Sequence, residues 1–299
     1  MAKLLLGEPI ALRILSEIKQ EVSRLNESNP FEPTLAILQT DHPGYSDAYT
    51  REQIRAARRS GTCLRRVVLP NGVSSKELID EITTLNSDPR VHGITVQLPI
   101  LSNGGIDIDE VLNAIDPNKD VDGGNYLRWK KCPFLVHIPC AAAACLLLLQ
   151  ETGPTPVGLR CLVIGRGRLV GTPVISLMLR SANATTTICH TDTRCLEEEV
   201  SRAEIVVSSV GKAHLVKGDW IRAEAIVIDC GTDASSGKVV GDVEFEKAVN
   251  RARWITPVPG GVGPLTVALL MRNTLNAAKR CHSLTTHSPL MEPTGILLH

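Results

Sequence analysis

The segment of this sequence that points most clearly to a chemical role contains three glycines spaced G-x-G-x-x-x-G, at Gly165, Gly167 and Gly171. The apolar residues 161–164 before them predict a buried parallel strand, and the apolar pattern behind them predicts a helix with Thr172 as its N-cap. Such a strand, turn and helix aim free backbone N–H groups and a positive dipole end at a phosphate. The spacing is one residue longer than the usual dinucleotide motif, so a tight turn without a ligand is the alternative.

The segments after the glycines favour the nucleotide-binding interpretation. Further strands are predicted at 184–189, 205–210 and 225–230, with a helix at 195–202, and Gly231 closes the last strand. Short apolar strands that alternate with helical segments predict a doubly wound parallel sheet. A turn without a ligand would not account for this whole arrangement, so we interpret it as a dinucleotide-binding domain.

Two polar positions in the first half of the chain are candidates for catalysis. Tyr49 and Gln53 lie on one face of a predicted helix that Ser46 opens, because residues three and four apart share a helix face. Gln97 is the polar residue near the end of a predicted strand at 91–98. In open α/β sheets ligands bind beyond the carboxyl ends of strands. The alternatives are an aromatic ring packed on the core beside a solvated amide, and a glutamine that caps a loop.

The run from Lys119 to Gly123 reads K-D-V-D-G, with Asp120 and Asp122 on either side of one small residue. On its own this pattern predicts a turn or a loose pair of metal ligands. No histidine or further carboxylate lies at ligand spacing, so we predict no metal site here.

The elements that must position these residues also form an α/β pattern. Strands are predicted at 34–39 and 64–69, and a capping box of Ser74 and Glu77 opens a helix that runs to Leu85. Helices are predicted at 9–25 and 107–115. Loops after these strands are expected to form one wall of a cleft.

Composition narrows the class of protein. The chain has 299 residues, enough for two domains, and a net charge of zero without basic clusters, which argues against a nucleic-acid partner. No secretory signal is recognisable, and the longest apolar run, 138–149, is too short to cross a membrane. The nine scattered cysteines contain no C-x-x-C pair and indicate reduced thiols. We therefore expect a cytoplasmic protein, with the mitochondrial matrix as the alternative.

From Gly7 to about Arg280 the chain resembles the methylenetetrahydrofolate dehydrogenase / methenyltetrahydrofolate cyclohydrolase family. The most specific match is the loop 255–266, which reads I-T-P-V-P-G-G-V-G-P-L-T. The other matching segments are V-Q-L-P at 96–99, K-D-V-D-G at 119–123, P-C at 139–140, G-R at 165–166, V-G at 170–171 and G-D-V at 241–243.

The resemblance implies two α/β domains with a reduced folate in the cleft between them. Residues 1–146 together with 265–285 would form the folate domain, and 147–264 a Rossmann-like domain that binds the dinucleotide. Residues 286–299 would form a mobile tail. The family also implies a homodimer through the nucleotide-binding domain.

The resemblance further implies roles for residues of the folate site. Tyr49 would orient the folate, Asp122 would hydrogen-bond its pterin, and Gln97 would lie beside the reacting carbon; with Gln53 these are the catalytic candidates. The remaining residues expected to bind substrate are Leu98, Pro259, Gly260 and Gly261.

The cofactor implied is NADP, with NAD possible because Asp192 follows the second strand. Arg166 would bind the 2′-phosphate with His190 and Thr191, since a guanidinium recognises phosphate in a fork geometry. The other expected cofactor-binding residues are Gly165, Gly167, Gly171, Val210, Gly211, Gly231 and Thr266.

One departure from the family bears directly on activity. The family pattern S-x-x-Y-x-x-x-K ends in a lysine that acts in proton transfer during hydrolysis, and here that position is Gln53. Glutamine has no titratable proton and cannot act as a general base near neutral pH. Hydride transfer needs no such relay, so we expect an NADP-dependent dehydrogenase with weak or no cyclohydrolase activity. The alternatives are a fully bifunctional enzyme and a non-catalytic binding paralogue.

Overall fold

The computed structural model describes residues 1–27, 30–41, 45–100, 105–124, 137–153, 155–180, 182–235 and 237–282, without the side chains of 45–48. The described chain divides into two compact units. We call them the six-stranded unit, residues 1–11 and 141–266, and the three-stranded unit, residues 12–140 and 267–282.

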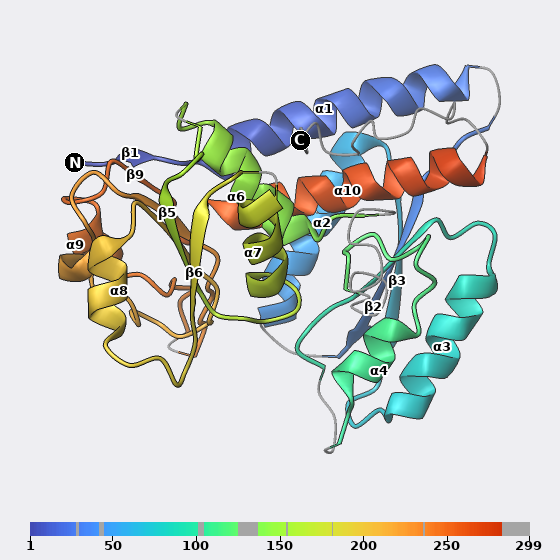
Figure 1. Cartoon of the computed structure of the whole chain (residues 1–299). Helices are drawn as coiled ribbons and strands as arrows, with labels where there is room; N and C mark the ends of the chain where they lie inside the picture. The colour runs from blue at the N-terminus through green and yellow to red at the C-terminus, as the bar shows by residue number, and fades with distance from the viewer. Residues whose placement is uncertain are drawn as a thin grey trace. The chain divides into compact units, whose positions relative to one another are not determined.

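The six-stranded unit is built on one parallel sheet in the order β1-β9-β8-β7-β5-β6. Figure 1 labels four of these strands, β1, β9, β5 and β6. Its strands are β1 (Lys3–Leu4), β5 (Arg160–Ile164), β6 (Thr185–Cys189), β7 (Ile205–Ser208), β8 (Ile226–Asp229) and β9 (Trp254–Ile255). Its helices are α6 (Cys140–Gln150), α7 (Gly171–Arg180), α8 (Leu196–Arg202), the 3-10 turn η1 (Gly218–Trp220) and α9 (Phe245–Ala248). Strands β7 and β8 are buried along their whole length, as expected where helices cover a parallel sheet. The predicted doubly wound α/β architecture is confirmed.

All four strands predicted for this unit are present, but two of them end earlier than expected. β7 ends at Ser208 and β8 at Asp229, because the backbone N–H groups beyond them bond to side-chain carboxylates. β1 and β9 were not predicted, since two residues are too few to show a periodic pattern. They join segments from opposite ends of the chain, with Leu4 beside Ile255.

The three-stranded unit has a parallel sheet in the order β3-β2-β4. Its strands are β2 (Thr34–Thr40), β3 (Cys63–Leu69) and β4 (Gly93–Val96), and its helices are α1 (Gly7–Asn26), α2 (Tyr45–Ser60), α3 (Ser75–Ser87), α4 (Ile108–Asn113) and α10 (Val262–Cys281). The central strand β2 is fully buried, whereas the edge strand β3 is partly exposed. α3 and α4 pack together (Figure 1). β4 is shorter than the predicted strand at 91–98, so Gln97 and Leu98 follow the strand and lie outside it.

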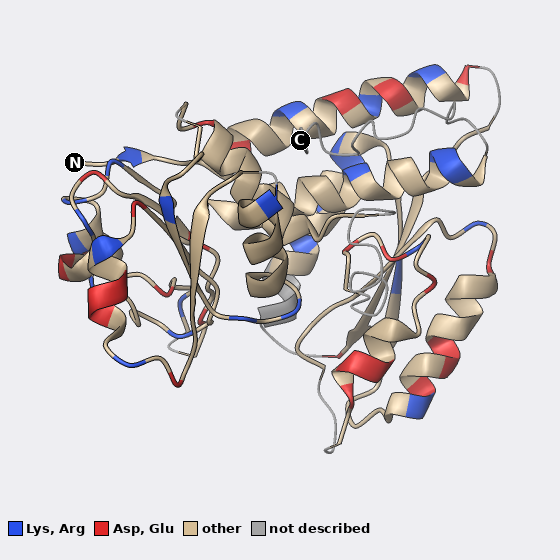
Figure 2. Ribbon diagram, in the orientation of Figure 1, with Lys and Arg blue, Asp and Glu red and all other residues tan. Residues whose placement is uncertain are grey.

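Local sequence signals explain several helix boundaries. The capping box of Ser74 and Glu77 is present at the start of α3, and Asp107 caps α4. The apolar stripe of α1 is buried from Ala11 to Val22. Positive and negative side chains alternate along α1, whereas α3 has one lysine at its start and only acids after it (Figure 2).

The two units differ at their ends from the domains expected from the sequence. The division falls within α1 after Ala11, at the start of α6 after Cys140, and within α10 after Thr266. Residues 1–11 and 141–146 thus lie in the six-stranded unit, where β1 pairs with β9. The assignment of 1–146 with 265–285 and of 147–264 to two functional domains stays a prediction.

Candidate functional site

The turn after β5 shows why two of the three glycines are required. Gly165 has a φ of +103°, and a Cβ there would lie 2.8 Å from the carbonyl oxygen of Ser209. A Cβ on Gly171 would lie 2.2 Å from the carbonyl oxygen of Gly165, whereas Gly167 has nothing within 4 Å. The backbone therefore folds tightly between β5 and α7 and leaves a glycine cradle of the kind that a dinucleotide pyrophosphate needs.

The start of α7 differs by one residue from the prediction. The helix begins at Gly171, so Thr172 lies in its first turn and is not the N-cap. Its hydroxyl group donates a hydrogen bond of 3.0 Å to the carbonyl oxygen of Arg166 and holds the turn against the helix. The Arg166 side chain is exposed beside this turn.

The residues after β6 lie at the same sheet edge as Arg166. β5 and β6 are parallel neighbours with Ile164 opposite Cys189, so His190 and Arg166 both follow the carboxyl end of a strand. Nδ1 of His190 accepts a hydrogen bond from the backbone N–H of Asp192 at 3.2 Å, and an Asp192 carboxylate oxygen lies 3.6 Å from the same nitrogen. The structure therefore gathers a guanidinium, an imidazole and one exposed carboxylate at the edge where a ribose or its phosphate would lie.

The loops after β7 and β8 complete this edge. The backbone N–H groups of Val210 and Gly211 donate to the carboxylate of Asp242, at 2.7 and 2.9 Å. These two residues can therefore offer a ligand only carbonyl oxygens and the exposed Val210 side chain. Gly231 lies so close to Asp242 that a Cβ on it would be 2.0 Å from the carboxyl carbon.

The proline- and glycine-rich loop is held against the start of α1. Val258–Pro259 is a cis peptide bond, and Gly260 has a φ of +117°. The carbonyl oxygen of Gly260 accepts a hydrogen bond from the N–H of Gly7 at 3.0 Å. Thr266 lies in the first turns of α10 and donates its hydroxyl hydrogen within the helix, to the carbonyl oxygen of Val262 at 3.0 Å. Its contact with a cofactor stays a prediction.

In the three-stranded unit, α2 carries Tyr49 and Gln53 one turn apart. Gln53 is 1% exposed, and its Oε1 atom has no hydrogen-bond partner among the described residues. Tyr49 is partly exposed. The side chain of Ser46, predicted to open this helix, lies outside the described residues.

Gln97 and Asp122 are both tied to strands of the same sheet. The N–H of Gln97 donates to the carbonyl oxygen of Leu38 at 2.8 Å, and the Leu98–Pro99 peptide bond that follows is cis. The carboxylate of Asp122 accepts a hydrogen bond of 3.0 Å from the Thr95 hydroxyl, two residues before Gln97. Asp122 keeps some solvent access but is densely surrounded by protein, and this burial raises the pKa of its carboxyl group above the ordinary value.

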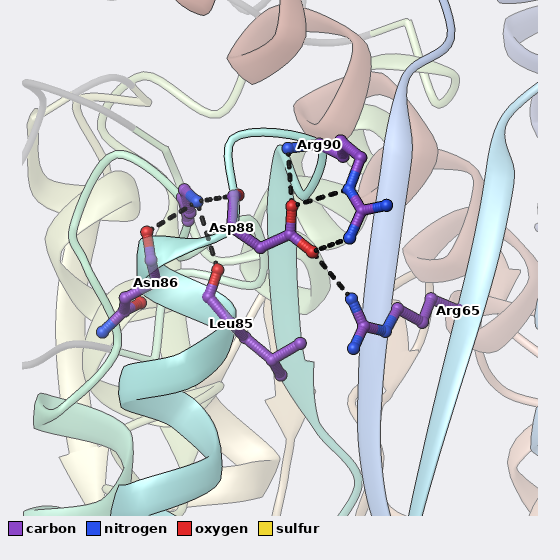
Figure 3. Close-up of polar contacts among 6 residues, drawn as sticks. Arg65, Leu85, Asn86, Asp88 and Arg90 are labelled. Carbon is purple, nitrogen blue, oxygen red and sulfur yellow. Dashed lines mark hydrogen bonds and ion pairs between the residues drawn. The ribbon is translucent and has the colours of Figure 1, made fainter.

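The other members of the K-D-V-D-G motif have structural roles. Nζ of Lys119 donates to the carbonyl oxygens of Leu85, Asn86 and Asp88 at the end of α3, at 3.2, 2.8 and 2.8 Å (Figure 3). Asp120 accepts hydrogen bonds from the N–H groups of Gly123 and Gly124, so the turn predicted here is present. Asp122 is therefore the acid of this motif whose carboxylate does not bond to the turn.

One thiol beside this acid was not considered a candidate from the sequence. Cys140 is fully buried, and its Sγ lies 3.3 Å from the carbonyl oxygen of Val121. Burial, together with the nearby Asp122 and Asp120, raises the pKa of this thiol well above its ordinary value, so it stays protonated. The P-C pair at 139–140 is the only sequence signal that marks it. Among the described residues no group of three or more His, Cys, Asp or Glu could hold a metal ion.

These features define an α/β protein with a dinucleotide-type glycine turn in one unit and clustered polar residues at strand ends in the other. Residues 5–122 match the family model for the tetrahydrofolate dehydrogenase/cyclohydrolase catalytic domain, and residues 139–282 match the NAD(P)-binding domain of the same family. The chain belongs to the tetrahydrofolate dehydrogenase/cyclohydrolase family.

Curated relatives agree with this assignment. The chain is 42% identical over 286 residues to the bifunctional protein FolD of Moorella thermoacetica, covering 93% of this chain and 99% of the relative. It is also 42% identical over 295 residues to the human cytoplasmic C-1-tetrahydrofolate synthase, where 93% of this chain matches. The chain spans about a third, 31%, of that longer protein.

Solved structures show the same fold. A methylenetetrahydrofolate dehydrogenase from Bombyx mori has a TM-score of 0.87 at 32% identity and covers 95% of this chain and 100% of that one. A methylenetetrahydrofolate dehydrogenase-cyclohydrolase of Trypanosoma brucei, complexed with NADP and an inhibitor, has a TM-score of 0.85 at 36% identity, covering 95% and 99%. None of the helices in the described part of this chain is both long and apolar enough to span a membrane.

Proposed function

We propose that this protein is an NADP-dependent dehydrogenase that oxidises 5,10-methylenetetrahydrofolate to methenyltetrahydrofolate. The observation that carries the proposal is the glycine turn after β5, where Gly165 and Gly171 leave no space for a side chain. The match of both units to one folate family supports the substrate class. The nicotinamide ring, when bound, supplies the hydride acceptor.

In this reaction the protein's own residues act mainly by orientation, because hydride transfer requires two carbon atoms to be aligned. Asp122, held by Thr95, would accept hydrogen bonds from pterin N–H groups. Tyr49 would orient the folate, and Gln97 and Leu98 would lie beside the reacting carbon. The loop of Pro259, Gly260 and Gly261 would line the approach of the nicotinamide.

The preference for NADP over NAD rests on charge at the sheet edge after β5 and β6. Arg166 is exposed there, and His190 lies beyond the neighbouring strand. A guanidinium binds the 2′-phosphate strongly. Asp192 is the opposing charge, and its carboxylate lies 3.6 Å from Nδ1 of His190.

We also propose that the cyclohydrolase step is weak. Gln53 is buried and neutral where the family has its lysine. Lys119, the lysine of the K-D-V-D-G motif, donates to three carbonyl oxygens at the end of α3, so its ammonium group is engaged there. The Trypanosoma brucei relative is named a dehydrogenase-cyclohydrolase, so full bifunctionality is the alternative.

Substitution of one side chain tests this part of the proposal. Gln53→Lys should raise the rate of methenyltetrahydrofolate hydrolysis by about a hundredfold, the usual contribution of a positioned acid or base. Gln53→Met, of similar length but without a titratable group, should not raise it. The decay of methenyltetrahydrofolate absorbance measures both. A wild-type rate comparable to that of the Gln53→Lys variant would contradict the proposal.

For the assembly we propose a homodimer through the six-stranded unit. Within the described part of the chain its edge strand β6 pairs with β5 alone, and Ile188 on it is 45% exposed. Leu179, at the end of α7, is 52% exposed. An unpaired strand edge with exposed apolar side chains is typical of an interface.

We place the protein in the cytoplasm, as the name of the human relative says of that protein.

A further inference from the structure

Two buried acids in the six-stranded unit have no role in the proposed reaction. Asp229 is the last residue of β8 and is 3% exposed, and Asp242 is 0% exposed. Acids are almost never fully buried unless their oxygens are paired. These two are paired almost entirely with backbone N–H groups of loops at one edge of the sheet.

Asp242 binds the loop that follows β7. One carboxylate oxygen accepts hydrogen bonds from the Ser208 hydroxyl and the Val210 N–H, both at 2.7 Å. The other accepts from the N–H groups of Gly211 and Lys212, at 2.9 and 2.8 Å. One side chain thus satisfies four donors within five consecutive residues, 208–212.

Asp229 binds the segment that carries Asp242. One of its oxygens accepts from the N–H groups of Gly231 and Asp242, at 2.9 and 3.1 Å, and the other from the N–H of Val243 at 2.8 Å. A Cβ on Gly241 would lie 2.1 Å from this carboxylate. Asp229 therefore fixes the backbone from which the Asp242 side chain projects.

The loop bound by Asp242 in turn contacts the glycine turn after β5. Ser209, between two residues bonded to Asp242, donates its N–H to the carbonyl oxygen of Ile164 at 2.9 Å and its hydroxyl to the same oxygen at 3.2 Å. The Ser209 carbonyl oxygen and hydroxyl are the atoms that a Cβ on Gly165 would meet at 2.8 Å. Asp229 thus holds the backbone of Asp242, Asp242 holds the residues on either side of Ser209, and Ser209 bonds to Ile164, the residue before Gly165.

We propose that Asp242, supported by Asp229, is a positioning residue for dinucleotide binding, because its carboxylate fixes the 208–212 loop against which the glycine turn packs. It does not touch the reacting atoms. A preset turn lowers the cost of ordering the loop when the cofactor binds. This inference rests on the proposed function, since it assumes that the glycine turn binds NADP.

The test compares isosteric variants of the full-length protein. Asp242→Asn replaces one acceptor oxygen by an N–H donor that faces other donors. It should raise the dissociation constant for NADPH and the KM for NADP by about ten- to one-hundred-fold, the usual effect of losing hydrogen bonds to a charged group. The KM for the folate and kcat at saturating NADP should change by less than about threefold, because a substitution away from the folate and the reacting atoms has only a small effect on them. Asp219→Asn, an exposed acid of the same unit, is the matched control and should bind NADPH like the wild type.

A milder variant keeps the test decisive if Asp242→Asn does not fold. Ser208→Ala removes only the hydroxyl donor and should raise the NADPH dissociation constant by about two- to tenfold. Unchanged NADPH binding in a folded Asp242→Asn variant, or in Ser208→Ala where Asp242→Asn is unfolded, would overturn the inference. So would equal losses of folate and NADPH affinity, which indicate a general structural role. A wild-type protein that binds no NADPH would instead refute the proposed function.

Discussion

At the scale of single residues, burial and neighbouring charges shift the pKa values of side chains in both units. Burial raises the pKa of Asp122, of Cys140 and of Asp229, and for Asp229 it raises the pKa of the carboxyl group from 3.8 to about 7. For Asp229 the cost of burial outweighs three N–H hydrogen bonds, and the nearby Asp242 charge adds to it.

The raised pKa of Asp229 predicts a pH dependence of stability. Between about pH 4 and pH 7 the folded chain holds a proton at Asp229 that the unfolded chain has already lost. Folding therefore takes up a proton in this window, so this group's contribution to stability is largest below pH 4 and falls as the pH rises towards 7. Melting temperatures measured across this range should decline more steeply for the wild type than for Asp229→Asn, which cannot titrate. Parallel curves for the two proteins would contradict the assignment.

At the scale of elements, the glycine turn after β5 gives a matched pair of substitutions. Gly171→Ala would place a Cβ 2.2 Å from a carbonyl oxygen, whereas Gly167→Ala meets nothing within 4 Å. We expect Gly171→Ala to lower the free energy of unfolding by about 1–3 kcal/mol, as overpacking does, and to abolish NADP binding. Gly167→Ala should change stability by about 0.5 kcal/mol or less. Denaturant titration with NADPH binding measures both, and equal effects of the two variants would disprove this account of the turn.

A second prediction at the scale of elements concerns how Lys119 stabilises the end of α3. Lys119 is the donor to three carbonyl oxygens there, where a positive charge also interacts favourably with the helix dipole. Lys119→Met should lower the free energy of unfolding by about 1–3 kcal/mol, because the partly buried carbonyl oxygens lose their donor. Lys76→Met, which removes an exposed lysine from the first turn of the same helix, should have no measurable effect. If both variants melt alike, Lys119 does not stabilise α3.

The sequence predicted elements better than contacts. Long periodic segments and local capping signals could be identified because their causes lie within one stretch of chain, as for Ser74 and Glu77 at the start of α3. Lys119 could not be placed, because its three acceptors lie 31 to 34 residues away in the chain. The roles of Asp229 and Asp242 were missed for the same reason. Their partners come from three loops that only the folded sheet brings together.

At the scale of the whole molecule, the sequence established the family and the α/β architecture, which both family models confirm. The structure has the glycine turn in the six-stranded unit, and Tyr49, Gln53, Gln97 and Asp122 in the three-stranded unit. The contacts of each predicted residue with folate or dinucleotide stay predictions.

The central claim is that the protein oxidises methylenetetrahydrofolate to methenyltetrahydrofolate and hydrolyses this product only slowly. The reason proposed is that Gln53 stands where the family resemblance leads us to expect a lysine. The most direct measurement follows NADPH and methenyltetrahydrofolate together after methylenetetrahydrofolate and NADP are added to the purified protein. We predict that both absorbances rise together, and that methenyltetrahydrofolate then decays only slightly faster than in a control without protein. NADPH formation without accumulation of methenyltetrahydrofolate would contradict the proposed weak cyclohydrolase activity. The absence of NADPH formation would contradict the account as a whole.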